Sequence, residues 1–74
     1  MKANLYNLCY KKRNDIVIVQ YKSPSGRLSK IVGTMLLPVE NFVEIRVNMY
    51  VPNNGTYILQ ILEDRIIDID GIKP

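Results

Sequence analysis

Six basic side chains in the first half of the chain are the residues whose type and spacing best fit a binding role. They form two groups and comprise Lys11, Lys12, Arg13, Lys22, Arg27 and Lys30. The formal net charge is +3, and six of the seven acids lie after residue 30. If both groups lie at the same end of a barrel, their cations converge on an anionic partner, with Tyr10 and Tyr21 as stacking surfaces. The alternative is that these cations are solvated and keep an apolar protein soluble.

The acidic residues near the end of the chain are the alternative chemical group. Asp68 and Asp70 share one face of an expected strand, with Asp64 and Glu63 just before it, and carboxylates so placed could hold a hard cation. The simpler interpretation is a solvated strand face, because the Asp-x-Asp spacing follows the β period and a calcium loop needs more oxygen ligands and a glycine turn. We therefore expect no metal site.

Few residues in this sequence could support catalysis. Histidine and tryptophan are absent, and Cys9 is the only cysteine, which we expect to be a buried, reduced thiol. The segment Ser23–Gly26 has one glycine, whereas a phosphate-binding loop needs several. We expect a protein that is not an enzyme and has no cofactor. No apolar run approaches the ~20 residues of a membrane span, and the N-terminus lacks the ~7–15-residue apolar core of a signal peptide, so we expect a cytoplasmic protein without a membrane partner.

Five segments have the pattern of strands and must position these groups. The clearest is 42–51, where apolar and polar residues alternate with a period of two. Ile16 to Tyr21 is β-branched and nearly continuous, which is typical of a strand covered on both faces or lying at the centre of a closed barrel. The segment 56–62 also has the pattern of a strand that is covered on much of both faces. The expected strands are 15–22, 27–37, 42–51, 56–62 and 66–70.

Short turns join these strands. Ser23–Gly26 predicts a tight reversal, and the residues from Pro52 to Gly55 fold the central hairpin. Gly33, inside a strand, predicts a bulge or a sharp bend where another backbone approaches closely. Tyr50 and Tyr57, on the two arms of the central hairpin, form either a cross-strand pair or part of a contact surface.

The first residues allow two interpretations. As a helix, residues 2–10 place Leu5, Leu8 and Cys9 on one stripe, and as a strand they place Tyr6, Leu8 and Tyr10 on one face. The segment therefore predicts a short helix or a sixth strand.

With 74 residues, the chain is long enough for a single small domain, residues 1–74. Its 47% hydrophobic and 23% charged residues exclude a disordered chain. Five β segments, one bent at a glycine, predict a mostly β fold closed into a small five-stranded barrel, because closure removes the open edges of so apolar a sheet.

The order of these segments resembles the small Sm-like or SH3-like β-barrels of bacteria and phages, including the YolD-like and WYL-type domains. The residues that carry the resemblance, over roughly 15–70, are Ile18–Tyr21 with its Pro-Ser-Gly turn, Lys30–Gly33, a long hairpin, and Leu62–Ile69. The chain has Leu36-Leu37-Pro38 where Sm-like proteins carry an aspartate after the bent strand, and Asn48 is the nearest match to their hairpin asparagine. No RNA-pocket residue is carried over. The resemblance implies a partner-sensing barrel in a regulatory setting, not catalysis.

These observations predict a non-enzymatic binding module, a regulatory or inhibitory protein of bacterial or phage type. Its basic end would contact nucleic acid or a host protein. The alternative is a structural homo-oligomeric module without nucleic-acid binding, in which strand edges or tyrosines join copies of the chain.

Overall fold

The computed structural model describes residues 1–48 and 55–74. Tyr50 and most of the expected turn at Pro52 lie outside the described residues. The elements are α1 (Ala3–Lys11), β1 (Ile16–Lys22), β2 (Leu28–Met35), β3 (Phe42–Asn48), β4 (Thr56–Leu62), the 3-10 turn η1 (Glu63–Arg65) and β5 (Ile66–Ile69). The expectation of a mostly β chain is confirmed.

The N-terminal segment is a helix. Leu5 and Cys9, one turn apart, are both buried in the core, while Tyr6 and Tyr10 on the outside stack with ring centroids 6.5 Å apart. After α1, Asn14 adopts a left-handed backbone with φ 68°, which asparagine tolerates better than most residues. Its N–H donates to the Met35 carbonyl at 2.8 Å, which ties the helix connector to the end of β2.

Within the described residues, the five strands form one antiparallel sheet in the order β4-β3-β2-β1-β5. β1 and β2 pair along their length, from Ile16 opposite Thr34 to Lys22 opposite Leu28. The reversal predicted between them is confirmed: the Gly26 N–H donates to the Ser23 carbonyl at 2.8 Å, and Gly26 has φ 84°.

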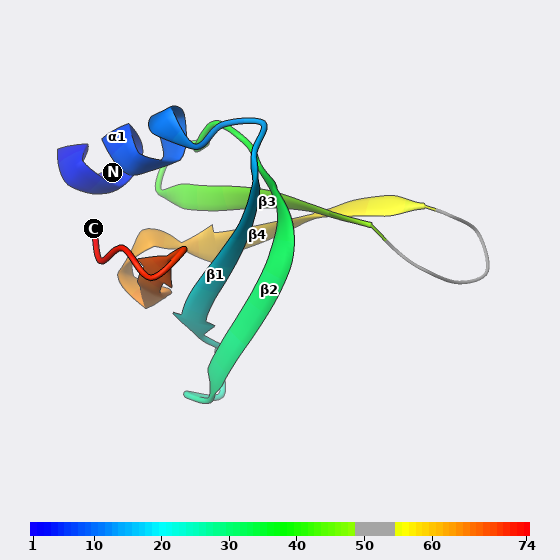
Figure 1. Cartoon of the computed structure of the whole chain (residues 1–74). Helices are drawn as coiled ribbons and strands as arrows, with labels where there is room; N and C mark the ends of the chain where they lie inside the picture. Colours follow the sequence, from blue (N-terminus) through cyan, green and yellow to red (C-terminus); the bar gives the residue numbers. More distant parts are fainter. Residues whose placement is uncertain (49–54) are drawn as a thin grey trace.

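The sheet divides into two hairpins where β2 meets β3, next to Gly33. Within residues 1–48 and 55–74, β2 pairs with β3 at Thr34 and Met35 alone, and the hairpins β1–β2 and β3–β4 then diverge (Figure 1). A Cβ at Gly33 would lie 2.5 Å from the Arg46 carbonyl oxygen and 2.5 Å from the Ile45 Cγ2 atom. The predicted close approach of another backbone is therefore confirmed, and only glycine permits it.

The core lies between the bent sheet and α1. One of its fully buried side chains, Cys9, comes from α1, and the others lie on the inner faces of the strands: Val17, Val19, Met35, Val43, Ile45 and Ile69. Burial raises the pKa of the Cys9 thiol to about 11, so the side chain is uncharged and behaves as a small apolar residue.

The sheet is open. Among residues 1–48 and 55–74, no ladder joins β4 to β5, so these strands form the two edges of the sheet. Figure 1 shows the two termini close together beside α1. No helix in the described part of the chain is long and apolar enough to cross a membrane.

Two strands are covered on fewer sides than their sequences predict. In β1 only the face with Val17 and Val19 is buried, and Ile16 and Ile18 on the other face are exposed. In β4 only Ile61 is buried. The expectation of cover on both faces is wrong for β1, because within the described residues α1 and the β3–β4 hairpin pack on the inner face alone.

Candidate functional site

The two basic groups lie at opposite ends of β1. Lys11–Arg13 precede the strand and Lys22 ends it, with Arg27 and Lys30 beyond the turn. Seven residues of strand separate the groups by about 20 Å, at ~3.3 Å per residue. The condition for a cluster of six cations at one end is therefore not met.

The first group holds the end of α1 in place. The Lys12 Nζ atom lies 2.9 Å from Asp70 Oδ2, and the Arg13 Nη1 atom donates to the Tyr10 carbonyl at 2.9 Å. The Arg13 guanidinium also lies 4.0 Å from the centroid of the Tyr10 ring. Two of these three cations thus have partners within the chain, and Tyr10 is occupied by Tyr6 and Arg13.

Asp70 connects α1, β1 and the end of β5. Its Oδ1 atom accepts from the Ile18 N–H at 2.8 Å, and its own N–H donates to the Ile18 carbonyl at 2.8 Å. The hydrogen bond from the Ile18 N–H lowers the pKa of the Asp70 carboxyl, and the hydrogen bond from Lys12 lowers it further. The carboxylate therefore has a structural role.

Replacement of Asp70 by asparagine is expected to change how stability depends on pH. Because the folded state lowers the pKa of this carboxyl, its stabilising contribution is complete above the ordinary value of 3.8 and is lost as the pH falls toward the lower folded pKa. Urea unfolding between pH 6 and pH 2 should show a shallower acid loss in Asp70→Asn than in the wild type. Asp68→Asn removes a carboxylate that makes no hydrogen bond in the described residues, and it is the matched control. Equal loss in all three proteins would contradict this role.

The other acids do not assemble with Asp70. Within residues 1–48 and 55–74, no three side chains of histidine, cysteine, aspartate or glutamate are placed to hold a metal ion. Asp64 lies in η1, whereas Asp68 lies on β5 opposite Gln20. These acids are close in the sequence, and that closeness was the reason to consider them as one group.

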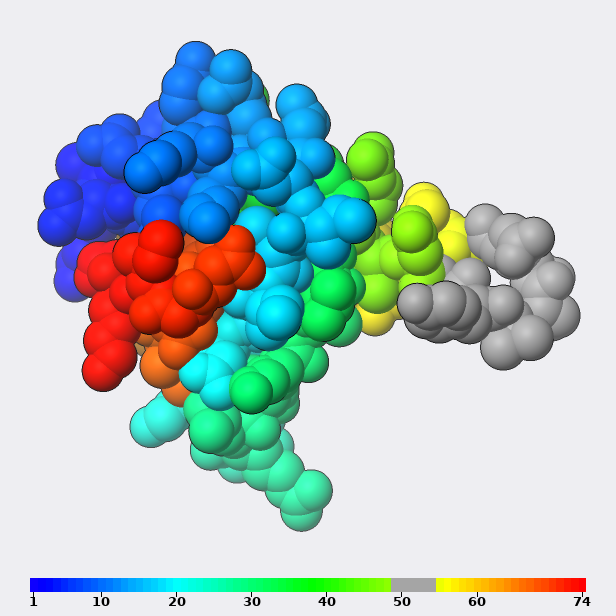
Figure 2. Space-filling model, viewed as in Figure 1, coloured from blue at the N-terminus to red at the C-terminus, as the bar shows by residue number. Residues whose placement is uncertain are grey.

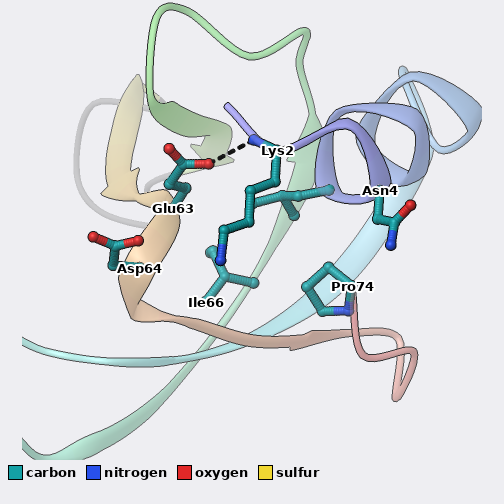
Figure 3. A pocket seen from close by; sticks show the side chains of 7 residues that line it. Lys2, Asn4, Glu63, Asp64, Ile66 and Pro74 are labelled. Carbon is teal, nitrogen blue, oxygen red and sulfur yellow. Dashed lines mark hydrogen bonds between the residues drawn. The ribbon is translucent and has the colours of Figure 1, made fainter.

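Glu63 and Asp64 border a hollow of about 290 Å³ between α1, η1 and the C-terminus (Figure 3). The Glu63 Oε2 atom accepts from the Lys2 N–H at 2.9 Å, as the dashed line marks, and its Oε1 lies 3.9 Å from the Met1 amine. Glu63 thus anchors the start of α1. The charged side chains that line this hollow are those of Lys2, Glu63 and Asp64.

The second basic group, Lys22, Arg27 and Lys30, lies around the turn between β1 and β2. Among the residues that the structure describes, the side chains of Lys22, Arg27 and Lys30 make no ion pair and no hydrogen bond. The turn between them is held by Ser23, whose Oγ lies 2.8 Å from Ser25 Oγ and accepts from the Arg27 N–H at 3.2 Å. These three cations can meet an external partner.

The same hairpin carries an exposed apolar surface on the face away from the core. We call it the outer patch: Ile16, Ile18, Leu28 and Val32, which are 76%, 49%, 64% and 55% exposed, respectively. Ile18 lies directly opposite Val32, and Leu28 lies opposite Lys22. Figure 2 shows β1 at the surface, between β2 and the C-terminal segment. The sequence signal for the patch was the uninterrupted apolar run of β1, which had been assigned to burial within the chain.

The border of the outer patch is mostly basic. A hollow of about 420 Å³ adjoins it where β2 and β3 diverge, lined by Ile16, Val32 and Arg46 among others. On the β5 side a second hollow brings Lys30 and Asp68 to its margin. Lys22, Lys30 and Arg46 lie near two acids, Asp68 and Asp70, and Asp70 is paired with Lys12. The remaining positive charge beside an apolar surface complements a partner that is apolar with acidic margins.

Comparison with known proteins finds no protein-family model, no curated protein and no solved structure that matches this chain.

Proposed function

We propose that this protein is a non-enzymatic binding module whose outer patch docks on a protein partner. The observation that supports this most is the exposure of Ile16, Ile18 and Val32 as neighbours on paired strands, with Leu28 further along the same face beyond Gln20 and Lys30. Their burial against a partner would remove apolar surface from water, which is the main favourable term in association. Lys22 and Lys30 at the margin would set orientation and the rate of encounter.

A protein partner fits this surface better than nucleic acid. Interfaces with nucleic acid are more polar and far more positive, and single strands bind by stacking of bases on aromatic rings. Here the centre of the surface is aliphatic, Tyr10 is stacked on Tyr6, and Tyr21 packs against the core. The separation of the two basic groups also weakens a phosphate-binding role.

We further propose that the fold is an open form of the Sm-like or SH3-like barrel, acting in a regulatory or inhibitory setting. The close backbone approach at Gly33 and the short corner η1 before β5 support this, because both belong to the resemblance seen in the sequence. In this proposal, the partner binds the outer patch on the exposed face of the open sheet.

Replacement of Ile18 and Val32 by serine is expected to abolish capture of the partner while the protein stays folded. The pair lies at the centre of the outer patch, and loss of central apolar contacts commonly weakens an interface more than tenfold. Immobilised wild type and variant would be compared for proteins retained from a bacterial lysate, with circular dichroism to check the fold. Nuclease treatment distinguishes the partner classes, because a protein that binds directly is retained after it.

Leu37→Ser with Val39→Ser is the matched control, since both residues are apolar and exposed but lie in the connector after β2. It should retain the same proteins as the wild type. Equal retention by all three proteins, or retention that nuclease removes, would contradict the proposal.

A further inference from the structure

β4 is an edge strand of the sheet, and its outer side is unpaired in the described residues. Its other side pairs with β3 from Thr56 to Leu62. Natural proteins blunt exposed edges with lysine, proline, bulges or very short strands. β4 has seven residues, none of them charged and none of them proline, and its register with β3 is unbroken. Its free backbone groups can therefore pair with another extended chain.

The opposite edge, β5, is protected. The strand has four residues, includes Asp68, and is closed at its end by the chain itself, because Ile69 and Ile72 exchange backbone hydrogen bonds at 3.0 and 2.9 Å. The carboxylate of Asp70 is also bound to the Ile18 N–H and to Lys12. The two edges thus differ in their capacity to accept a strand.

A groove of about 310 Å³ runs beside β4. Its apolar lining includes Tyr21, Phe42, Leu59 and Leu62, and the charged residues that line it are Lys22 and Arg65. No acid lines this groove, and neither cation has an ion pair in the part of the chain that the structure describes. An occupant with apolar and acidic side chains would complement the groove in both respects.

We propose that an extended segment of a partner protein, with alternating apolar and acidic side chains, adds to β4 as a further strand. Its backbone pairs with the free edge, its apolar side chains lie in the groove, and its acids meet Lys22 and Arg65. The site shares Lys22 with the border of the outer patch but none of the four apolar residues of that patch, and it does not depend on the function proposed for it. A second copy of this chain fits less well, because its own β4 has no acid and its β5 edge is closed.

The test uses a defined probe, a fluorescent nine-residue peptide in which isoleucine alternates with glutamate, and a second peptide with lysine in place of glutamate. Fluorescence anisotropy with the full-length protein should show binding of the acidic peptide alone. The double variant Lys22→Glu and Arg65→Glu should bind it at least tenfold more weakly and should bind the lysine peptide instead. Such a reversal of preference would not arise from misfolding.

The matched control is Arg27→Glu with Lys30→Glu, which reverses two cations outside the groove lining and should leave the preference unchanged. The variant Ile18→Ser with Val32→Ser should bind the acidic peptide normally, which separates this site from the outer patch. Amide hydrogen exchange should slow in residues 56–62 when the peptide binds. No binding, protection confined to α1, equal weakening by both charge reversals, or a dimer that buries β4 in light scattering would each overturn the proposal.

Discussion

Gly33→Ala is expected to remove much of the stability of this protein, because the added methyl group has no space. Its carbon would lie 2.5 Å from the Arg46 carbonyl oxygen, and a backbone atom cannot move aside as a flexible side chain can. Such overpacking costs about 3 kcal/mol or more when strands must separate. A 74-residue domain has a free energy of unfolding of about 4–11 kcal/mol, at roughly 0.05–0.15 kcal/mol per residue.

Urea unfolding measures this effect, as a fall in the midpoint concentration. The matched control is Gly55→Ala, because a Cβ at Gly55 meets no atom within 4 Å. That variant should unfold within about 0.5 kcal/mol of the wild type, as surface substitutions usually do. Equal midpoints for Gly33→Ala and Gly55→Ala would contradict the close approach of the β3 backbone to Gly33.

Ile45→Ala is expected to lower the free energy of unfolding by about 2–5 kcal/mol. The side chain is 0% exposed and lies on the inner face of β3, where that strand meets β2 at Met35. Its truncation leaves a cavity that the neighbouring core residues fill only in part. The loss should be seen by both thermal and urea unfolding.

Ile18→Ala provides the contrast for the same substitution on an exposed strand face. Ile18 is 49% exposed on the outer face of β1, so the expected loss is about 1 kcal/mol or less. A loss as large as that of Ile45→Ala would mean that the outer patch serves folding. The expected difference assigns Ile45 to the core and leaves Ile18 free for a partner.

The strand positions and the two best-defined turns could be predicted from periodicity and turn residues. The alternation from Phe42 onward predicted β3, and glycine placement predicted both the reversal at Gly26 and the close approach at Gly33. The helix at Ala3–Lys11 could not be decided, because both spacings place apolar residues on one side. Burial of Leu5 and Cys9 on the sheet decides it, and no local pattern carries that information.

The candidate surfaces were harder to predict than the fold. A continuous apolar strand such as Ile16–Val19 is compatible with cover from within the chain or from a partner, and the sequence does not distinguish the two. The convergence of six cations failed for a geometric reason, since one strand separates the groups. The free edge of β4 depends on which strands become neighbours, which is a property of topology that strand periodicity does not contain.

The most direct test of the central claim is a methyl NMR spectrum of the isoleucine-, leucine- and valine-labelled protein with and without the captured partner. The account predicts that methyl resonances of Ile16, Ile18, Leu28 and Val32 shift or broaden on binding, while those of Leu37 and Val39 do not. Resonances of the outer patch that stay unchanged in the complex, with shifts at Leu37 and Val39 instead, would contradict it.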